Sequence, residues 1–223
     1  MEIKTIELNS VIPMTYYHYN TSDQSPLLIV LHGYTDSSTA AIRRLCPENL
    51  ADLEVLAPNG LFPVPARRGE VWKPAYAWYF ADFSKNAVLM HPDISAKAVS
   101  QLLSELNLVA RPKILVGFSQ GVFFIPYLLR EIKNVCSIFA VGAAYRSEDY
   151  AQSIDIPFEA LHGTDDEVIS LTTAQSSFEQ FVKTKCANGK FSVFPGLKHT
   201  MNDESRKYLS DRLIETASVL RRK

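Results

Sequence analysis

Short apolar runs recur along this chain, separated by turns and by stretches with helical spacing. The clearest run is Leu27–Leu31, which is continuously apolar and ends at a His-Gly pair. A strand buried on both faces of a parallel, helix-covered sheet has this composition. Further strands are expected at 53–57, 113–118, 135–141, 157–161 and 190–194. The alternation predicts an α/β fold with a mostly parallel, doubly wound sheet and helices on both faces.

The segments between these runs predict the helices. They are expected over about 37–50, from 93, from 120, over 172–183 and over 203–220. In the second of them Asp93 is placed to cap the first turn, and apolar residues recur with a period of 3.6. Before the first buried run, 3–8 and 14–19 alternate between polar and apolar residues, which predicts an antiparallel pair at the edge of the sheet.

The stretch 59–92 does not fit this alternation, because it is rich in proline and in aromatic residues. Long irregular segments in compact domains are commonly functional, and the many aromatic side chains argue against disorder. We therefore expect 59–92 to form a folded flap over a binding face. Since the 223 residues contain no internal repeat and no interdomain linker, a single domain is expected over 1–223.

Composition excludes several classes of function. The formal net charge is −1, so no overall field attracts nucleic acid or an anionic membrane. The cysteines Cys46, Cys136 and Cys186 are scattered, which argues against a disulfide framework and against a metal site. No signal peptide and no apolar run long enough to span a bilayer are visible, so a cytoplasmic protein without stable membrane insertion is expected.

The strongest motif is Gly117-Phe118-Ser119-Gln120-Gly121. It follows a predicted strand and precedes a predicted helix, as a nucleophile elbow must. In such an elbow the serine sits in a strained turn and its hydroxyl is exposed at the amino end of the helix. This context favours Ser119 as a nucleophile over an ordinary glycine-serine turn.

A serine nucleophile needs a base and an acid that orients it, and both positions are filled. The run 157–161 ends in His162-Gly163-Thr164-Asp165-Asp166, and the run 190–194 is followed by His199. His199 is the only histidine after the candidate acids, and either aspartate could orient it. His32 and His162, each followed by glycine at a strand end, are expected to shape loops by hydrogen bonding.

Two backbone N–H groups are expected to hold the oxyanion that forms when a serine attacks an acyl carbon. One belongs to the residue after the nucleophile, Gln120. The second is expected in the loop after Leu27–Leu31, where His32-Gly33-Tyr34 makes Tyr34 the candidate donor.

Together these motifs resemble the phospholipase/carboxylesterase family, which includes acyl-protein thioesterases and small bacterial esterases. The resemblance runs from about Ser25 to the C-terminus. It implies the α/β-hydrolase fold with little or no cap domain, a small-molecule ester or thioester substrate, no cofactor and a possible homodimer. It also implies that Asp166 is the acid and that the segment around Trp78 lies near the acyl site.

Three positions depart from the family's usual pattern. Val122 replaces a second glycine after the elbow, and Glu167 replaces a proline after the acid. Pro126 falls within the predicted elbow helix, where its missing N–H is expected to kink the helix. None of the three is a position of the triad, but all bear on the shape of the acyl pocket.

These observations predict a serine carboxylesterase that cleaves esters of short to medium acyl chains through an acyl-enzyme. An acyl-protein thioesterase or lysophospholipase is the alternative, since the same triad can hydrolyse these substrates as well. A non-catalytic binding protein is disfavoured, because such proteins tend to lose the nucleophile or the base. Trp78, Phe80 and Phe123 are candidate substrate-binding residues, and each could equally belong to the core.

Overall fold

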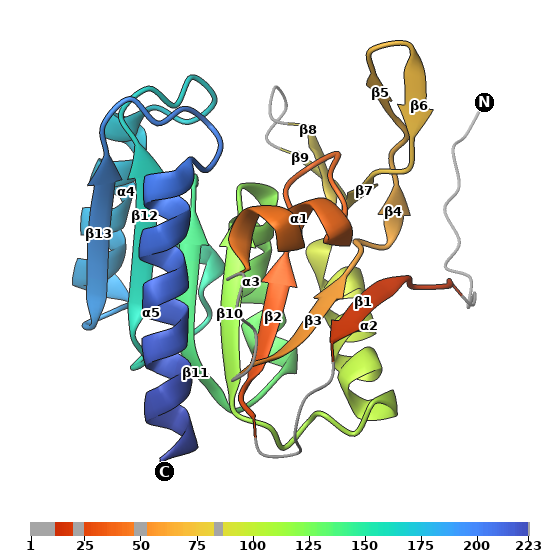
Figure 1. Cartoon of the computed structure of the whole chain (residues 1–223), viewed down its shortest axis with the longest axis horizontal. Coiled ribbons are helices and arrows are strands. Elements are labelled where there is room, and N and C mark those ends of the chain that lie inside the picture. The colour runs from red at the N-terminus through yellow and green to blue at the C-terminus, as the bar shows by residue number, and fades with distance from the viewer. Residues whose placement is uncertain (1–11, 20–24, 47–52, 83–86, 223) are drawn as a thin grey trace.

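A central sheet organises the molecule. The structure, a computed structural model, describes residues 12–19, 25–46, 53–82 and 87–222. Within them, strands of the large sheet lie in the order β1-β3-β2-β10-β11-β12-β13 (Figure 1). Their bounds are β1 Tyr16–Tyr19, β2 Leu27–Leu31, β3 Glu54–Pro58, β10 Lys113–Phe118, β11 Val135–Val141, β12 Phe158–Gly163 and β13 Gly189–Phe194.

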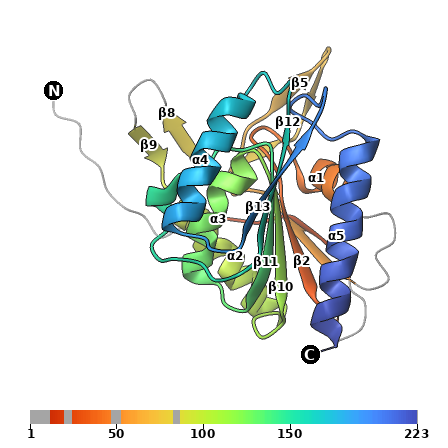
Figure 2. The ribbon, with the colours of Figure 1, turned by 90° about the vertical axis from the view of Figure 1, so that its left-hand side faces the viewer.

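All neighbouring strands of this sheet are parallel except β1, which pairs antiparallel with β3. Helices α1 and α5 cover one face, and α2, α3 and α4 cover the other (Figures 1 and 2). The helices are α1 Ser38–Leu45, α2 Pro92–Glu105, α3 Gln120–Glu131, α4 Leu171–Thr184 and α5 Asp203–Arg221, with a short 3-10 turn, η1, at Ser147–Asp149. The predicted doubly wound, mostly parallel sheet is confirmed.

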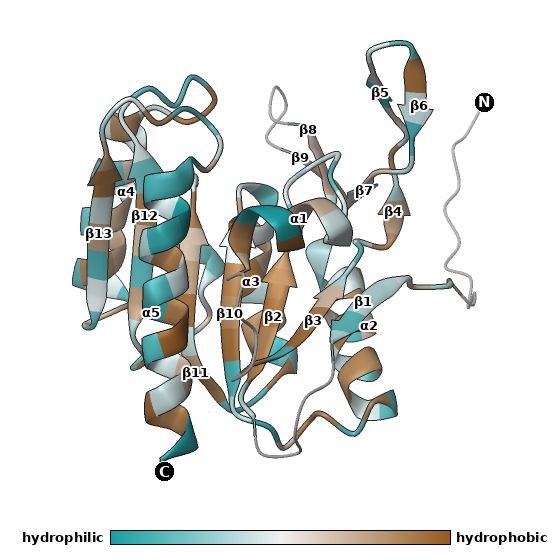
Figure 3. Cartoon of the chain, in the orientation of Figure 1, coloured by the Kyte–Doolittle hydropathy of each residue, from teal (hydrophilic) through white to brown (hydrophobic). Residues whose placement is uncertain are grey.

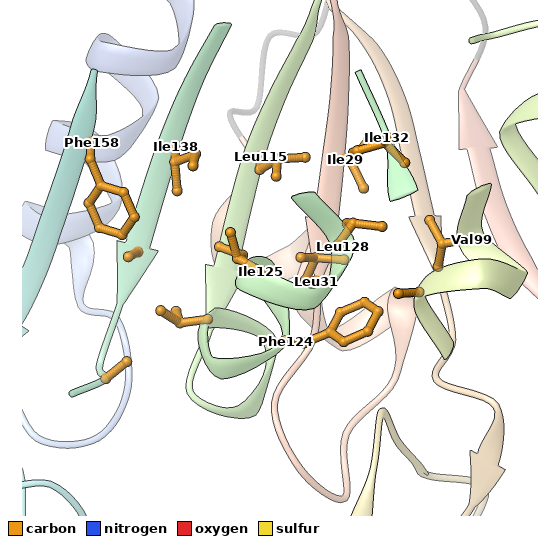
Figure 4. Close-up of a cluster of buried hydrophobic side chains, with 14 of the residues drawn as sticks. Ile29, Leu31, Val99, Leu115, Phe124, Ile125, Leu128, Ile132, Ile138 and Phe158 are labelled. Carbon is orange, nitrogen blue, oxygen red and sulfur yellow. The ribbon is translucent and has the colours of Figure 1, made fainter. Parts of the chain in front are cut away.

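The sheet has an apolar core on each face, as expected for strands covered by helices on both sides. Every residue of β2 and β10 is buried, and these strands are apolar along most of their length (Figure 3). On the α2–α3–α4 face, Leu31, Leu115 and Phe124 are fully buried and belong to one cluster (Figure 4). On the other face, Leu209 and Leu213 of α5 belong to a second cluster together with strand residues such as Val116.

Several local predictions differ from the structure. Helix α1 ends at Leu45, earlier than expected, and 47–52 lie outside the described residues. The His91 side chain, rather than Asp93, caps α2, because Pro92 already occupies the first helical position. The expected strand at 3–8 lies outside the described residues, while β1 takes β3 as its partner. In contrast, helix α3 begins at Gln120 as predicted and continues through the buried Pro126 to Glu131, and the kink at Pro126 stays a prediction.

The stretch 59–92 contains short strands paired two by two, and it is not wholly irregular. It lies at the carboxyl end of the large sheet, above β2 and β10 in Figure 1. The pairs are β4 Phe62–Pro63 with β7 Tyr76–Ala77, β5 Ala66–Arg68 with β6 Val71–Lys73, and β8 Phe80–Asp82 with β9 Ala87–Met90. Parallel α/β sheets bind ligands at this end, so these pairs are placed to border a site.

Candidate active site

Ser119 stands in a strained turn between β10 and α3. Its backbone has φ of 50° and ψ of −117°, a conformation that non-glycine residues rarely adopt. The flanking glycine is required by packing, since a Cβ atom on Gly121 would lie 2.4 Å from the carbonyl oxygen of Leu31. Strand and helix therefore approach closely, and the serine is held at the amino end of α3.

Asp166 and His199 form a hydrogen-bonded pair on the loops after β12 and β13. His199 Nδ1 lies 2.7 Å from Asp166 Oδ2. The other carboxylate oxygen, Oδ1, accepts the backbone N–H groups of Val168 and Ile169 at 2.9 and 2.8 Å. Burial opposes ionisation of Asp166, but the hydrogen bonds from Ile169 and His199 outweigh it and lower its pKa. The carboxylate thus stays charged beside the imidazole.

The neighbouring aspartate points elsewhere. Asp165 is exposed, its Oδ1 accepts the Thr164 hydroxyl at 2.7 Å, and its N–H donates to the carbonyl of Leu197 at 3.0 Å. The structure therefore brings Asp166, and not Asp165, to the imidazole. The second contact also ties the acid loop to the loop that carries His199.

His199 lies beside the nucleophile turn. Its ring packs against Phe118, the residue before Ser119, with ring centroids 4.9 Å apart. A Cβ atom on Gly142, at the end of β11, would lie 3.4 Å from His199 Cε1. The predicted acid and base therefore pair beside the turn that carries the predicted nucleophile, although the three residues follow three different strands, β10, β12 and β13.

The two predicted oxyanion donors border the same turn. Gln120 is the first residue of α3, so its N–H has no acceptor within the helix. Tyr34 follows Gly33 just after β2, and a Cβ atom on Gly33 would lie 3.5 Å from Ser119 Cβ. The loop that carries Tyr34 thus runs past the serine, and its neighbour Thr35 has a φ of 53°.

His32 shapes the Tyr34 loop from within the core, as the sequence predicts. Its Nδ1 donates to the Gly33 carbonyl at 2.7 Å, and its Nε2 accepts the Gly60 N–H at 2.8 Å. Burial lowers the pKa of His32 to about 4, so the ring is neutral at pH 7. The equally buried His162 has its Nε2 2.8 Å from the Ile169 carbonyl, in the acid loop.

A cavity of about 560 Å³ opens at Ser119. Among the predicted site residues, Ser119, Gln120, Tyr34, Phe80 and Phe123 line it. The flap prediction agrees in part, since Tyr79, Phe80, Ala81 and Val88 come from 59–92. The cavity walls are completed by Pro92, Tyr127, Arg146, Asp149, Val168 and Ile169.

Trp78 does not line this cavity, which corrects its assignment to the substrate-binding residues. Its side chain is fully buried, with its ring stacked between His32 and Phe124 at centroid distances of 4.7 and 4.5 Å. Its indole Nε1 donates to the His32 carbonyl at 2.8 Å. The ring of Trp78 is therefore packed in the core, and the neighbouring Tyr79 and Phe80 line the cavity instead.

The Gln120 side chain has a second role that the motif alone does not reveal. Its Oε1 accepts the Trp78 N–H at 3.0 Å, and its Nε2 donates to the Tyr79 carbonyl at 3.0 Å. These bonds fix the flap strands against the nucleophile turn. The available signal was a polar residue at the first position of a helix whose following residues, 121–126, are apolar.

The polar part of the cavity wall was also missed. Tyr127, Arg146 and Asp149 come from α3 and from the segment after β11, where no periodic pattern distinguishes them. Within the ranges that the structure describes, no three His, Cys, Asp or Glu side chains form a group suited to a metal ion. No helix in those ranges combines the length and apolar character that a membrane span requires.

Comparison with known proteins places this chain in a family. Residues 18–213 match the family model described as phospholipase/carboxylesterase. Acyl-protein thioesterase 1 homolog 2 of Dictyostelium discoideum is 26% identical over 213 residues, covering 87% of this chain and 93% of its own.

Solved structures agree on the fold. Esterase PE8 superposes with a TM-score of 0.65 at 20% identity, covering 91% of this chain and 99% of that one. Zea mays acyl-protein thioesterase 2 gives the same TM-score and the same two coverages at 16% identity. Both the predicted fold class and the predicted family are confirmed. The chain belongs to the phospholipase/carboxylesterase family and has the α/β-hydrolase fold.

Proposed function

We propose that this hydrolase cleaves carboxylic esters by transferring the acyl group first to Ser119 and then to water. The observation that carries the proposal is the Asp166–His199 hydrogen bond of 2.7 Å, made beside a serine held in a strained turn. A merely structural serine would not need this backbone conformation, and the fold would not need a charged carboxylate on the imidazole.

In the proposed reaction His199 is the base. Because Nδ1 is engaged by Asp166, Nε2 is the nitrogen left to take the Ser119 proton as the hydroxyl attacks the ester carbonyl. Asp166 stabilises the imidazolium that results. His199 then returns the proton to the leaving alcohol, and a water molecule repeats the attack on the acyl-enzyme.

The oxyanion of each tetrahedral intermediate would be held by the N–H groups of Tyr34 and Gln120. Loss of a single such donor in a serine hydrolase costs roughly 10²–10³ in turnover. The neutral His32 ring supports this arrangement, because it holds the Gly33 carbonyl and the Gly60 N–H in fixed positions next to Tyr34.

Cavity size favours acyl groups of short to medium length. About 560 Å³ suits a small ligand, and the walls near Ser119 are apolar or aromatic, with Phe80 and Phe123 among them. The alternative is a thioester substrate, which the similarity to an acyl-protein thioesterase supports. The predicted homodimer and the absence of a cofactor stay predictions.

The test is turnover on matched substrates. Butanoyl, octanoyl and hexadecanoyl groups are presented as p-nitrophenyl esters and as thioesters of one thiol, and kcat/KM is compared within each series. We expect the butanoyl or octanoyl compound to be preferred and the ester series to be hydrolysed. Activity confined to thioesters would favour the alternative, and a preference for hexadecanoyl groups would contradict the proposed chain length.

A further inference from the structure

The cavity at Ser119 has a polar wall that the acyl-transfer chemistry does not use. Arg146, Asp149 and Tyr127 face the same space as Ser119, whereas Phe80 and Phe123 form its apolar wall. We propose that Arg146 binds a carboxylate carried by the substrate, so that the enzyme prefers esters with a free carboxyl group. This inference rests on the proposed function and specifies its substrate class.

The guanidinium of Arg146 is only partly engaged by the protein. Its Nε lies 3.2 Å from Glu148 Oε1 and 3.4 Å from Asp149 Oδ2. Among the described residues, no acceptor is hydrogen-bonded to Nη1 or Nη2, although the side chain lines the cavity and is half exposed. The two terminal nitrogens are the part of arginine that matches both oxygens of a carboxylate.

Tyr127 and Asp149, the other two residues of this polar wall, already have partners. Asp149 Oδ1 accepts the Tyr127 hydroxyl at 3.1 Å, and Arg130 Nη2 donates to the Asp149 carbonyl at 2.6 Å. Burial and the nearby Asp149 raise the pKa of Tyr127 to about 12, so the phenol keeps its proton and donates it in the hydrogen bond to that carboxylate. Among Tyr127, Arg146 and Asp149, the unused hydrogen-bond donors are therefore the terminal nitrogens of Arg146.

Long-range electrostatic attraction would not produce the proposed preference for carboxylate esters. Arg146 and Arg130 are accompanied by the acids Asp93, Glu148 and Asp149, so the local formal charge is not positive. The ion pair with Glu148, whose side chain is 67% exposed, is of the surface type that stabilises little. Recognition would come from direct, two-point contact inside the cavity, where water is partly excluded.

Two substrate types share this chemistry. The carboxylate can be the far end of the acyl group, as in a half-ester of a dicarboxylic acid, or it can belong to the alcohol, as in an acylated hydroxy acid. In both cases hydrolysis breaks the bond between the acyl carbon and the ester oxygen, adds one water and leaves the second carboxylate unchanged. Matched ester pairs distinguish the two.

The experiment compares monomethyl adipate with methyl hexanoate for the acyl side, and the acetate of 5-hydroxypentanoate with pentyl acetate for the alcohol side. Within each pair a carboxylate replaces a methyl group at constant chain length. For at least one pair we expect the carboxylate ester to have the higher kcat/KM. Arg146→Gln should lower that preference, the ratio of the two kcat/KM values, by about 10- to 100-fold, mainly through KM.

Arg146→Lys keeps the charge but loses the planar fork, and it should restore only part of the preference. Arg130→Gln is the matched control, since it removes a nearby positive charge that does not line the cavity, and it should leave the ratio within about two-fold. Should Arg146→Gln fail to fold, inhibition of the unmodified enzyme by adipate against hexanoate gives a second measurement, and adipate should inhibit more strongly.

The outcomes separate the two proposals. If none of the four esters is hydrolysed, the proposed esterase function fails. If the uncharged esters are hydrolysed but neither carboxylate ester is preferred, the assignment of Arg146 is overturned. It is equally overturned if Arg146→Gln leaves the ratio unchanged, or if Arg130→Gln lowers it as much.

Discussion

Nδ1 of His199 lies 2.7 Å from Oδ2 of Asp166, and the carboxylate's second oxygen accepts two backbone N–H groups of its own loop. The imidazole is therefore held by an acid that is itself fixed by the backbone. This relationship sets the tautomer of His199 and leaves Nε2 for the reaction. A substitution of Asp166 should therefore lower turnover without a matching loss of stability.

Asp166→Asn should lower turnover by up to about 10⁴-fold, because an amide keeps the shape but favours the wrong histidine tautomer. Asp165→Asn is the matched control, since Asp165 contacts Thr164 and not His199, and it should stay within a few-fold of the parent. The measurement is kcat/KM on one soluble ester at pH 8. An inactive Asp165→Asn beside an active Asp166→Asn would reverse the assignment.

His32 predicts a stability that depends on pH. Its pKa is about 4 in the folded protein against about 6.5 in the unfolded chain, so between these values the unfolded chain binds more protons. The free energy of unfolding should fall as pH is lowered from 6.5 towards 4, by about 2 to 3 kcal/mol from this group.

The check is urea unfolding at pH 7.5 and 4.5 for the parent and for His32→Gln, which can still donate and accept but does not titrate. The variant should be less stable at pH 7.5 and should lose less stability between the two pH values. If both proteins lose the same amount, His32 does not titrate in this range.

Trp78 should act on stability and not on substrate choice. Trp78→Phe leaves the His32 carbonyl without its indole donor and opens space in the core, which should cost about 2 to 4 kcal/mol. The ratio of octanoyl to butanoyl ester turnover should not change. Phe123→Ala, which enlarges the cavity, should raise that ratio. A larger change of the ratio in Trp78→Phe than in Phe123→Ala would contradict the placement of Trp78 in the core.

The sequence was sufficient for the sheet and for the candidate serine and histidine, because local patterns mark them, whereas the choice of Asp166 over Asp165 came from the family resemblance. A strand buried on both faces, such as Leu27–Leu31, is apolar throughout, and the Gly117–Gly121 elbow needs its glycines wherever it occurs. The acid and the histidine follow strand ends, and parallel strands bring such ends to one edge of the sheet.

The rest depended on contacts between residues distant in the sequence. Trp78 is buried because His32 and Phe124 stack on its two sides, and nothing in the short strands around it has a period that indicates this. Likewise, the carboxamide of Gln120 finds its partners at Trp78 and Tyr79, about forty residues away. Arg146 reaches the cavity from an irregular segment after β11, where side-chain direction is set by the tertiary structure.

The central claim is that Ser119 is the nucleophile, and covalent labelling tests it most directly. The parent protein and Ser119→Ala are treated with a fluorophosphonate, and the intact mass of each is measured alongside turnover of p-nitrophenyl butyrate. The parent should gain one phosphonyl group as its activity disappears, while Ser119→Ala should stay unlabelled, with turnover lowered by about 10⁶-fold. Labelling of Ser119→Ala, or turnover near that of the parent, would contradict the account.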